Sequence, residues 1–174
     1  MESFTNNFEI HRGDKMLKIM FVCHGNICRS PMAEAIFLDM IKKNGLEDKI
    51  SVNSSATSSE EIYRGVGNPI YPPALAELKK HKIPTYDHRA TKLLKSDYDE
   101  YDFFLGMDSA NIRNMNFIFG GDEDEKIHKL LSFTDLKKED VSDPWYSGDF
   151  TTAYNDIYEG CRCFLGYLLE NDMI

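Results

Sequence analysis

The chain has 174 residues and carries 29 acidic against 20 basic side chains, which gives a formal net charge of −9. A hydrophobic content of 42% and a charged content of 28% are typical of one soluble globular domain with a real core. The negative charge argues against nucleic-acid or membrane partners, and the sequence has no span-length apolar run and no signal-peptide core, which favours the cytoplasm. Four cysteines in such a chain are expected to be reduced or redox-active rather than structural disulfides.

The first half of the chain alternates strand-like and helix-like patterns. Residues 1–16 are polar without periodicity and are expected to form an N-terminal extension, so that the folded domain spans 17–174. The predicted elements are a central parallel strand at 17–22, a helix from Ser30-Pro31 to Asn44-Gly45, a short strand at 50–53 and a helix from Pro72 to about His81.

The second half continues the alternation. The predicted elements are a strand at 102–106, a short helix capped by Asp108 that runs through Met115, a loop at 120–126, a strand at 130–133 and a long helix over 149–169. Strands that alternate with helices predict an α/β fold, with a parallel sheet covered on both faces. Ligands of such sheets bind at the carboxyl ends of the strands, where Cys23 falls.

The segment from Cys23 to Pro31 is the most informative part of the sequence. Five residues separate Cys23 from Arg29, directly after a buried-type strand and before an amphipathic helix. A loop at a helix N-terminus gathers unpaired N–H groups and the positive end of the helix dipole, so it binds a tetrahedral oxyanion and favours a thiolate. The planar guanidinium of Arg29 can hold two phosphate oxygens at once. These features together predict phosphoryl transfer through a cysteinyl-phosphate at Cys23.

The residues around the loop support this interpretation over a metal site. Ser30 and Pro31 have the residue types of an N-cap and a first helical residue, and they are predicted to open the helix. A zinc site built from Cys23, His24 and Cys28 is disfavoured because no matching second pair lies at ligand spacing downstream. No metal or other cofactor is therefore expected.

A candidate acid lies far along the chain from this loop. A tyrosyl group leaves poorly as a phenolate, so an enzyme that cleaves its phosphate ester should supply a proton. Asp143 is followed by Pro144, which holds it in an extended conformation, and the rings of Trp145 and Tyr146 could wall a flat aromatic substrate. Asp143 is one of 29 acidic residues, so spacing alone also permits a plain turn aspartate.

With these segments in view, the chain resembles the low-molecular-weight protein tyrosine phosphatases from about Leu17 to its end. The resemblance rests on residues 22–31, 55–58, 67–69, Met107-Asp108-x-x-Asn111 and 143–146, in that order. It implies three layers, with a four-stranded parallel sheet flanked by helices on both faces. It implies Cys23 as the nucleophile, Arg29 as the phosphate and transition-state binder, and Asp143 as general acid and then base. The implied partners are phosphotyrosine-containing proteins, with inorganic phosphate or other oxyanions in the site.

The resemblance also gives roles to the remaining loop residues. The phosphate-binding residues that it implies are His24, Gly25, Asn26, Ile27, Cys28 and Arg29. Gly25 and Asn26 tolerate the positive φ that an inward-curling loop needs, and the Asn26 amide would pin the loop. Ser30 would donate a hydrogen bond to the Cys23 thiolate. A histidine braces the loop asparagine in the family, and the partially matching segment around His88 supplies the candidate.

Two further expectations concern regulation and recognition. In the family a second loop cysteine forms a reversible disulfide with the nucleophile under peroxide, which here implies a redox role for Cys28. Many relatives carry a tryptophan before the Gly-Asn-Pro element, where the longer segment 59–66 of this chain contains Tyr63. Tyr63 is therefore expected to form one wall of the cleft, with Trp145 opposite.

Three other functions are compatible with parts of the pattern. A thiol-coupled arsenate reductase needs further redox cysteines, and none lies between Cys28 and Cys161, which with Cys163 is expected to pack within the last helix. A protein-arginine phosphatase resembles this loop but carries threonine in place of Ile27. A phosphotyrosine-binding module would keep the anion cradle but could lose the nucleophile or the acid, and both residue types are present here.

Overall fold

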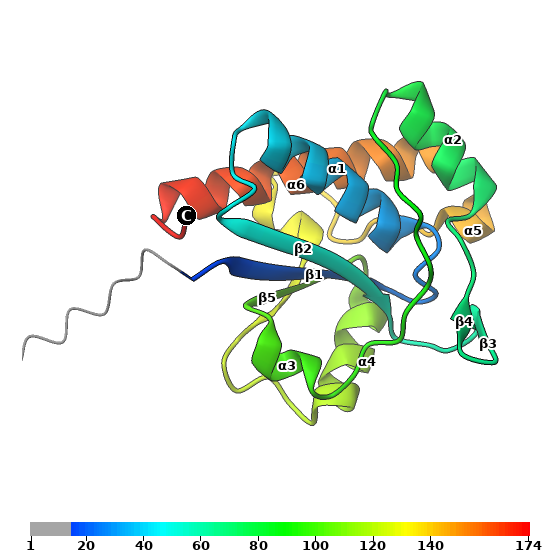
Figure 1. Ribbon diagram of the computed structural model, residues 1–174, viewed down its shortest axis with the longest axis horizontal. Coiled ribbons are helices and arrows are strands. Elements are labelled where there is room, and N and C mark those ends of the chain that lie inside the picture. The colour runs from blue at the N-terminus through cyan, green and yellow to red at the C-terminus, as the bar shows by residue number, and fades with distance from the viewer. Residues whose placement is uncertain (1–14) are drawn as a thin grey trace, which may run out of the picture.

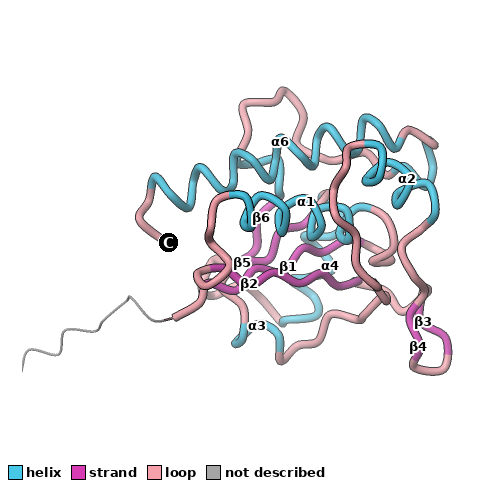
Figure 2. The backbone as a smooth tube through the Cα atoms, turned by 45° about the horizontal axis from the view of Figure 1, so that its top comes forward, coloured by secondary structure: helices cyan, strands magenta, loops and turns pink. Residues whose placement is uncertain are grey.

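The structure is a computed structural model that describes residues 15–174, so most of the predicted extension 1–16 lies outside the described residues. Its centre is a four-stranded parallel sheet in the order β2-β1-β5-β6 (Figure 1, Figure 2). The strands are β1 (Leu17–Cys23), β2 (Ile50–Ala56), β5 (Phe103–Gly106) and β6 (Ile127–Lys129). The predicted parallel sheet is confirmed, and β1 is one of its two central strands.

Helices cover both faces of the sheet and complete the three predicted layers (Figure 1). One side holds α1 (Arg29–Lys43), α6 (Phe150–Glu170) and, packed against both, α2 (Pro72–Lys80). The other side holds α3 (Asp97–Glu100) and α4 (Ser109–Phe119). The remaining elements are the hairpin β3 (Ile62–Tyr63) and β4 (Val66–Gly67), the 3-10 helix η1 (Leu130–Phe133) and the short helix α5 (Pro144–Ser147).

The alternation of side chains along β1 builds two apolar cores. Ile19, Phe21 and Cys23 belong to the larger core with α1 and α6, whereas Met20 and Val22 belong to the smaller core with α4. All five are at most 5% exposed, which is why β1 is a continuous apolar run in the sequence. The strand therefore places Cys23 at its carboxyl end, on the side of the sheet that α1 covers.

Most predicted elements are present with shifted ends. β2 continues past the predicted end to Ala56, and α4 continues past Met115 to Phe119. Gly120, in the left-handed conformation with φ of 75°, ends α4. Among residues 15–174, none of the helices has both the length and the apolar character needed to cross a membrane.

The predicted strand at 130–133 is wrong. These residues form η1, and the fourth strand is β6, which lies just before them in the chain. Leu130 and Leu131 are buried against α6, so their apolar pattern reflects packing onto a helix. A short apolar run has no periodicity that distinguishes a buried strand from a buried turn of helix.

Two glycines of α6 provide a matched test of this packing. A Cβ at Gly160 would lie 2.6 Å from Cγ of Leu130, whereas a Cβ at Gly166 would meet no atom within 4 Å. Alanine in a helix interior gains about 0.5–1 kcal/mol over glycine, while overpacking a core costs about 1–3 kcal/mol. We expect Gly166→Ala to raise the free energy of unfolding by about 0.5–1 kcal/mol and Gly160→Ala to lower it by about 1–2 kcal/mol in urea titrations. Equal stabilisation by both would contradict the contact of Leu130 with Gly160.

Candidate active site

The site begins in the loop that joins β1 to α1. Cys23 is the last residue of β1 and Arg29 is the first residue of α1. The helix starts before its predicted start: Cys28 occupies the N-cap without a side-chain cap bond, so Ser30 is not the N-cap and Pro31 is not the first helical residue. Ser30 is fully buried, and its Oγ lies 3.0 Å from the Sγ of Cys23. Because no side chain caps α1, its first N–H groups remain available to an anion.

Asn26 is fully buried and holds the shape of this loop. Its φ is 59°, in the left-handed region, as predicted. Its Nδ2 donates to the Oγ of Ser30 at 2.8 Å and to the Oγ of Ser54 at 2.9 Å, and its Oδ1 accepts the N–H of Thr91 at 3.0 Å. Its own backbone N–H donates to the Sγ of Cys23 at 3.3 Å. The amide is therefore bonded at both ends and fixes the middle of the loop.

Gly25 and His88 both lie next to Asn26 in the structure. Gly25 is not in the left-handed region, contrary to the prediction. A Cβ there would lie 3.1 Å from Cγ of Glu61, a tight contact that glycine avoids. His88 is buried, and its Nε2 lies 2.6 Å from the carbonyl oxygen of Asn26. The His88 ring therefore contacts the backbone carbonyl of Asn26 and not the side-chain amide of Asn26.

The side chain of Arg29 is 3% exposed and connects three distant parts of the chain. Its Nη1 donates to Oδ2 of Asp108 at 2.8 Å and to the carbonyl of Val141 at 2.9 Å, and its Nη2 lies 3.4 Å from Oδ2 of Asp143. Burial alone lowers the pKa of the guanidinium, but the charges of Cys23 and Asp143 and the hydrogen bond to Asp108 raise it above its ordinary value. Arg29 is therefore a permanent positive charge in the pocket.

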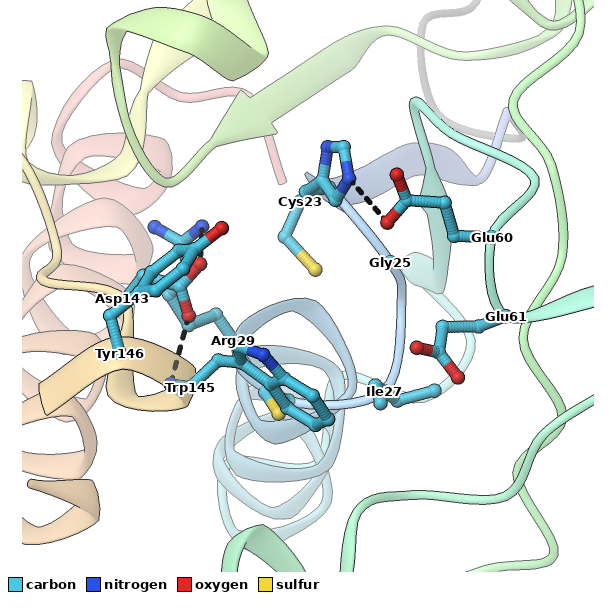
Figure 3. Close-up of a pocket in the computed structure, with 11 residues that line it drawn as sticks. Cys23, Gly25, Ile27, Arg29, Glu60, Glu61, Asp143, Trp145 and Tyr146 are labelled. Atoms are coloured by element: carbon cyan, nitrogen blue, oxygen red, sulfur yellow. Dashed lines mark hydrogen bonds and ion pairs between the residues drawn. The ribbon is translucent and has the colours of Figure 1, made fainter. Parts of the chain in front are cut away.

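One wall of the pocket comes from α5, which Asp143 caps by accepting the N–H of Trp145 at 3.1 Å. Trp145 is 53% exposed, and its ring packs on that of Tyr71 with centroids 4.9 Å apart. Tyr146 is 86% exposed at the rim. Figure 3 shows Asp143, Trp145 and Tyr146 along the same side of the pocket, so the structure brings these three predicted residues together with Cys23.

The opposite wall comes from the loop before β3, and the sequence prediction missed its residues. Glu60 and Glu61 line the pocket there, and Oε2 of Glu60 lies 2.9 Å from Nε2 of His24 (Figure 3). The placement predicted for Tyr63 is wrong: it lies outside the pocket lining, 72% exposed on the hairpin β3–β4, with the guanidinium of Arg64 over its ring. The longer loop carries Tyr63 past the pocket and brings two acids to it, and no motif marks these acids in the sequence.

Ile27 and Cys28 form an apolar part of the pocket and pack with Ala90. They are 8% and 6% exposed. Burial, followed by the charges of Cys23 and Asp143, raises the pKa of the Cys28 thiol to about 12. Cys28 is therefore an uncharged thiol near pH 7. It lies at the N-cap of α1, at the other end of the loop that begins after Cys23.

These groups face one cavity of about 130 Å³, which brings a sulfur nucleophile, a helix N-terminus, a buried guanidinium and a carboxyl group together. The helix N-terminus and Arg29 can attract an oxyanion to the sulfur of Cys23, and the Asp143 carboxyl group lines the same cavity. The described residues 15–174 contain no group of three or more His, Cys, Asp or Glu side chains that could hold a metal ion. The structure therefore combines a parallel α/β sheet with a cysteine thiol and an arginine at the start of a helix, in one pocket.

The chain belongs to the low molecular weight phosphotyrosine protein phosphatase family, which its residues 18–173 match. It is 36% identical over 160 residues to the low molecular weight protein-tyrosine-phosphatase YfkJ of Bacillus subtilis (strain 168), across 91% of this chain and 100% of that protein. It is 34% identical over 156 residues to PtpA of Staphylococcus aureus (strain bovine RF122 / ET3-1), across 90% and 96%. The crystal structure of YfkJ from Bacillus subtilis superposes with a TM-score of 0.85 at 34% identity, covering 90% of this chain and 97% of that one.

Asp108 both holds Arg29 and caps α4, where it accepts the N–H of Asn111 at 2.9 Å. Burial alone raises the pKa of Asp108, but hydrogen bonds from Asn111 and Arg29 outweigh it and lower the pKa below its ordinary value. A carboxyl group with a depressed pKa adds stability above its unfolded pKa and loses that stability as the pH falls through its folded pKa. Asp108→Asn keeps a good cap but removes the charge opposite Arg29, so we expect a loss of about 1–3 kcal/mol at pH 7.

The measurement is urea unfolding of both proteins at pH 7 and at about pH 3, below the ordinary pKa of aspartate. The gap between wild type and Asp108→Asn should narrow at the lower pH. Asp108 is then largely protonated in the unfolded wild type but not in its folded state, and this difference in proton binding favours unfolding of the wild type. Asp149→Asn is the control for a cap carboxylate, since Asp149 caps α6 through Thr152 and has no arginine partner within residues 15–174. Its pKa is also lowered, by the hydrogen bonds of Thr152, so its gap should narrow too, but by less than that of Asp108→Asn. A gap of equal size at both pH values would contradict the ion pair as the source of the stability.

Proposed function

We propose that this tyrosine phosphatase works in two steps through a phosphocysteine at Cys23. The observation that carries the proposal is that Cys23, Arg29 and Asp143 line one cavity, with the Asp143 carboxyl group 3.4 Å from the guanidinium. In the first step the Cys23 sulfur bonds to phosphorus, the bond to the tyrosyl oxygen breaks, and the proton of Asp143 passes to that oxygen. In the second step water bonds to phosphorus, the sulfur–phosphorus bond breaks, Asp143 takes a proton from the water, and inorganic phosphate leaves.

Charge on the transferring group is stabilised by the base of the pocket. Arg29 and the N–H groups at the start of α1 hold the phosphoryl oxygens where negative charge lies throughout the reaction. The hydroxyl of Ser30, 3.0 Å from the Cys23 sulfur, donates to the thiolate before attack and again when sulfur departs. The backbone of His24 to Arg29 supplies the phosphate cradle.

The aromatic ring of the substrate is recognised by the walls above the cradle. Trp145 is half-exposed at the pocket and Ile27 adds an apolar surface, so a phosphotyrosine ring gains burial that the short phosphoserine side chain cannot reach. The apolar side chain of Ile27 offers no hydrogen bond to a guanidinium, which favours phosphotyrosine over phosphoarginine. Tyr146 forms the outer rim of the same wall, and Tyr63 is left out of the recognition site.

The cysteines support a phosphatase rather than an arsenate reductase. Cys161 is fully buried in α6 and does not line the pocket, which makes it unsuited to relay a disulfide from Cys23. Catalysis by Cys23 requires a reduced thiol, and this favours the cytosol as the place of action.

Reversible oxidation would protect the nucleophile. Peroxide converts the Cys23 thiolate to a sulfenic acid, and the Cys28 thiol then attacks that sulfur, releasing water and forming a disulfide. The raised pKa of Cys28 supports only the first part of this order, because it leaves Cys23 as the cysteine that peroxide oxidises. Cys28 must lose its proton as it attacks the sulfenic acid.

The test of the reaction uses two esters that differ in their leaving group. Wild type should hydrolyse nitrophenyl phosphate and phenyl phosphate, and Cys23→Ser should bind phosphate but hydrolyse neither. Asp143→Asn should slow phenyl phosphate by about 10²–10⁴-fold and nitrophenyl phosphate much less, because nitrophenolate leaves without a proton. Glu60→Gln is the matched control, since Glu60 is another acid of the pocket and should affect both esters alike. Equal losses for both esters in Asp143→Asn would contradict the acid role, and faster turnover of phosphoarginine or arsenate would overturn the substrate class.

The test of redox protection compares recovery after oxidation. Wild type, Cys28→Ser and the control Cys163→Ser are treated with peroxide, then with reductant, and assayed for aryl phosphate hydrolysis. Wild type and Cys163→Ser should recover, whereas Cys28→Ser should lose activity permanently because nothing captures the sulfenic acid of Cys23 before further oxidation. Full recovery of Cys28→Ser would show that Cys28 has no protective role.

A further inference from the structure

A buried carboxylate outside the pocket lies at the end of a hydrogen-bond chain that leads to the nucleophile. Glu34 is 8% exposed in α1, one helical turn after Ser30, and does not line the pocket. The Oγ of Ser54 in β2 donates to Oε2 of Glu34 at 2.6 Å, and the hydroxyl of Tyr86 donates to the same oxygen. Desolvation of that hydroxyl, then the charge of Glu34, raise the pKa of Tyr86, which keeps it a donor.

The direction of every hydrogen bond in this chain follows from the carboxylate. A carboxylate only accepts, so the single proton of Ser54 is committed to Glu34. The Ser54 oxygen must then accept from Nδ2 of Asn26, at 2.9 Å, and the second Nδ2 proton goes to the Oγ of Ser30 at 2.8 Å. Ser30 thus accepts from Asn26, and its own proton is directed to the Cys23 sulfur at 3.0 Å.

If the Oδ1 and Nδ2 of Asn26 exchanged places, the proton of Ser30 would no longer be directed to Cys23. With Oδ1 between the two serines, both hydroxyls could donate to it, and the proton of Ser30 would be drawn away from Cys23. Two groups oppose that orientation: Glu34, which takes the proton of Ser54, and the N–H of Thr91, which donates to Oδ1 at 3.0 Å.

We propose that Glu34 is a positioning residue that orients Ser54, Asn26 and Ser30 so that Ser30 donates to the Cys23 thiolate. The proposal deepens the proposed function and rests on it for catalysis, but its effect on the thiolate exists without substrate. A through-space effect of the Glu34 charge has the opposite sign, because a nearby negative charge disfavours a second one. The two explanations therefore predict opposite shifts when Glu34 is replaced.

The experiment measures the alkylation of Cys23 by iodoacetamide as a function of pH, with the modified residue identified by mass spectrometry. Glu34→Leu should raise the midpoint pH by about one unit, because the thiolate loses one hydrogen bond, which gives about tenfold slower alkylation well below the midpoint. Glu34→Gln keeps an acceptor oxygen and should recover part of the shift. Ser54→Ala, which cuts the chain without removing a charge, should give a shift similar to that of Glu34→Leu.

Glu77→Leu is the matched control, since Glu77 is an equally buried glutamate in α2 that contacts His81 and Thr151 rather than the loop. It should leave the midpoint unchanged.

In the aryl phosphate assay Glu34→Leu should lower kcat more than it weakens inhibition by inorganic phosphate, because Arg29 and the backbone cradle remain. An unchanged or lower midpoint in folded Glu34→Leu would overturn the proposal, and if that variant does not fold, an unchanged midpoint in Ser54→Ala would do so. Absence of phosphatase activity in wild type would refute the proposed function but leave the alkylation comparison intact.

Discussion

The site depends on one constraint: the short segment between β1 and α1 must turn so that Cys23 and the start of α1 face the same cavity. The buried amide of Asn26 meets this constraint from inside the loop, with Ser30 and Ser54 as acceptors and the N–H of Thr91 as donor. Its left-handed backbone costs about 1 kcal/mol or more, and it persists because the surrounding hydrogen bonds leave no alternative. Cys23 receives its position from this arrangement, since the same residue donates a backbone N–H to its sulfur.

The parallel sheet brings the remaining groups to that loop. β1 ends at Cys23, and its neighbour β5 is followed within two residues by Asp108, so both reach the same edge. The guanidinium of Arg29 then spans from Asp108 to Asp143, which stand 79 and 114 residues away from it in sequence. A single buried cation thereby holds the start of α1 against the loop that carries Asp143, so a change in Asp108 or Asp143 would affect the position of Arg29.

Features that are encoded locally could be predicted from the sequence. The strand, loop and helix around Cys23 and Arg29 follow from an apolar run, loop residues and an amphipathic pattern that adjoin one another. The end of α1 was predictable for the same reason, whereas its start was not, because Ser30 has the type of a cap but its hydroxyl turns to the Cys23 sulfur. Local propensity could not reveal a partner that only the folded loop provides.

Features that depend on tertiary placement could not be predicted. Tyr63 and Glu60 are three residues apart in one polar loop, and only the path of the hairpin decides that Glu60 lines the pocket while Tyr63 does not. The run at 130–133 was apolar in the sequence because it packs on α6, where Leu130 meets Gly160. In the sequence, nothing distinguishes Glu34 from the other charged residues of its helix, because its partners Ser54 and Tyr86 come from distant segments.

The electrostatics of the whole molecule oppose its own substrate. A net charge of −9, together with Glu60 and Glu61 at the mouth of the pocket, repels a phosphate dianion at long range. At physiological ionic strength this repulsion is screened beyond about 8 Å, whereas the N–H groups of the cradle and the guanidinium of Arg29 act at contact. Binding is therefore determined by donors that a phosphate reaches only after it has entered the cavity. In the proposed mechanism the base of the pocket therefore holds the phosphate and the walls above it select the aromatic ring. The buried hydrogen bonds of Asn26 hold the short loop on which this phosphate binding depends.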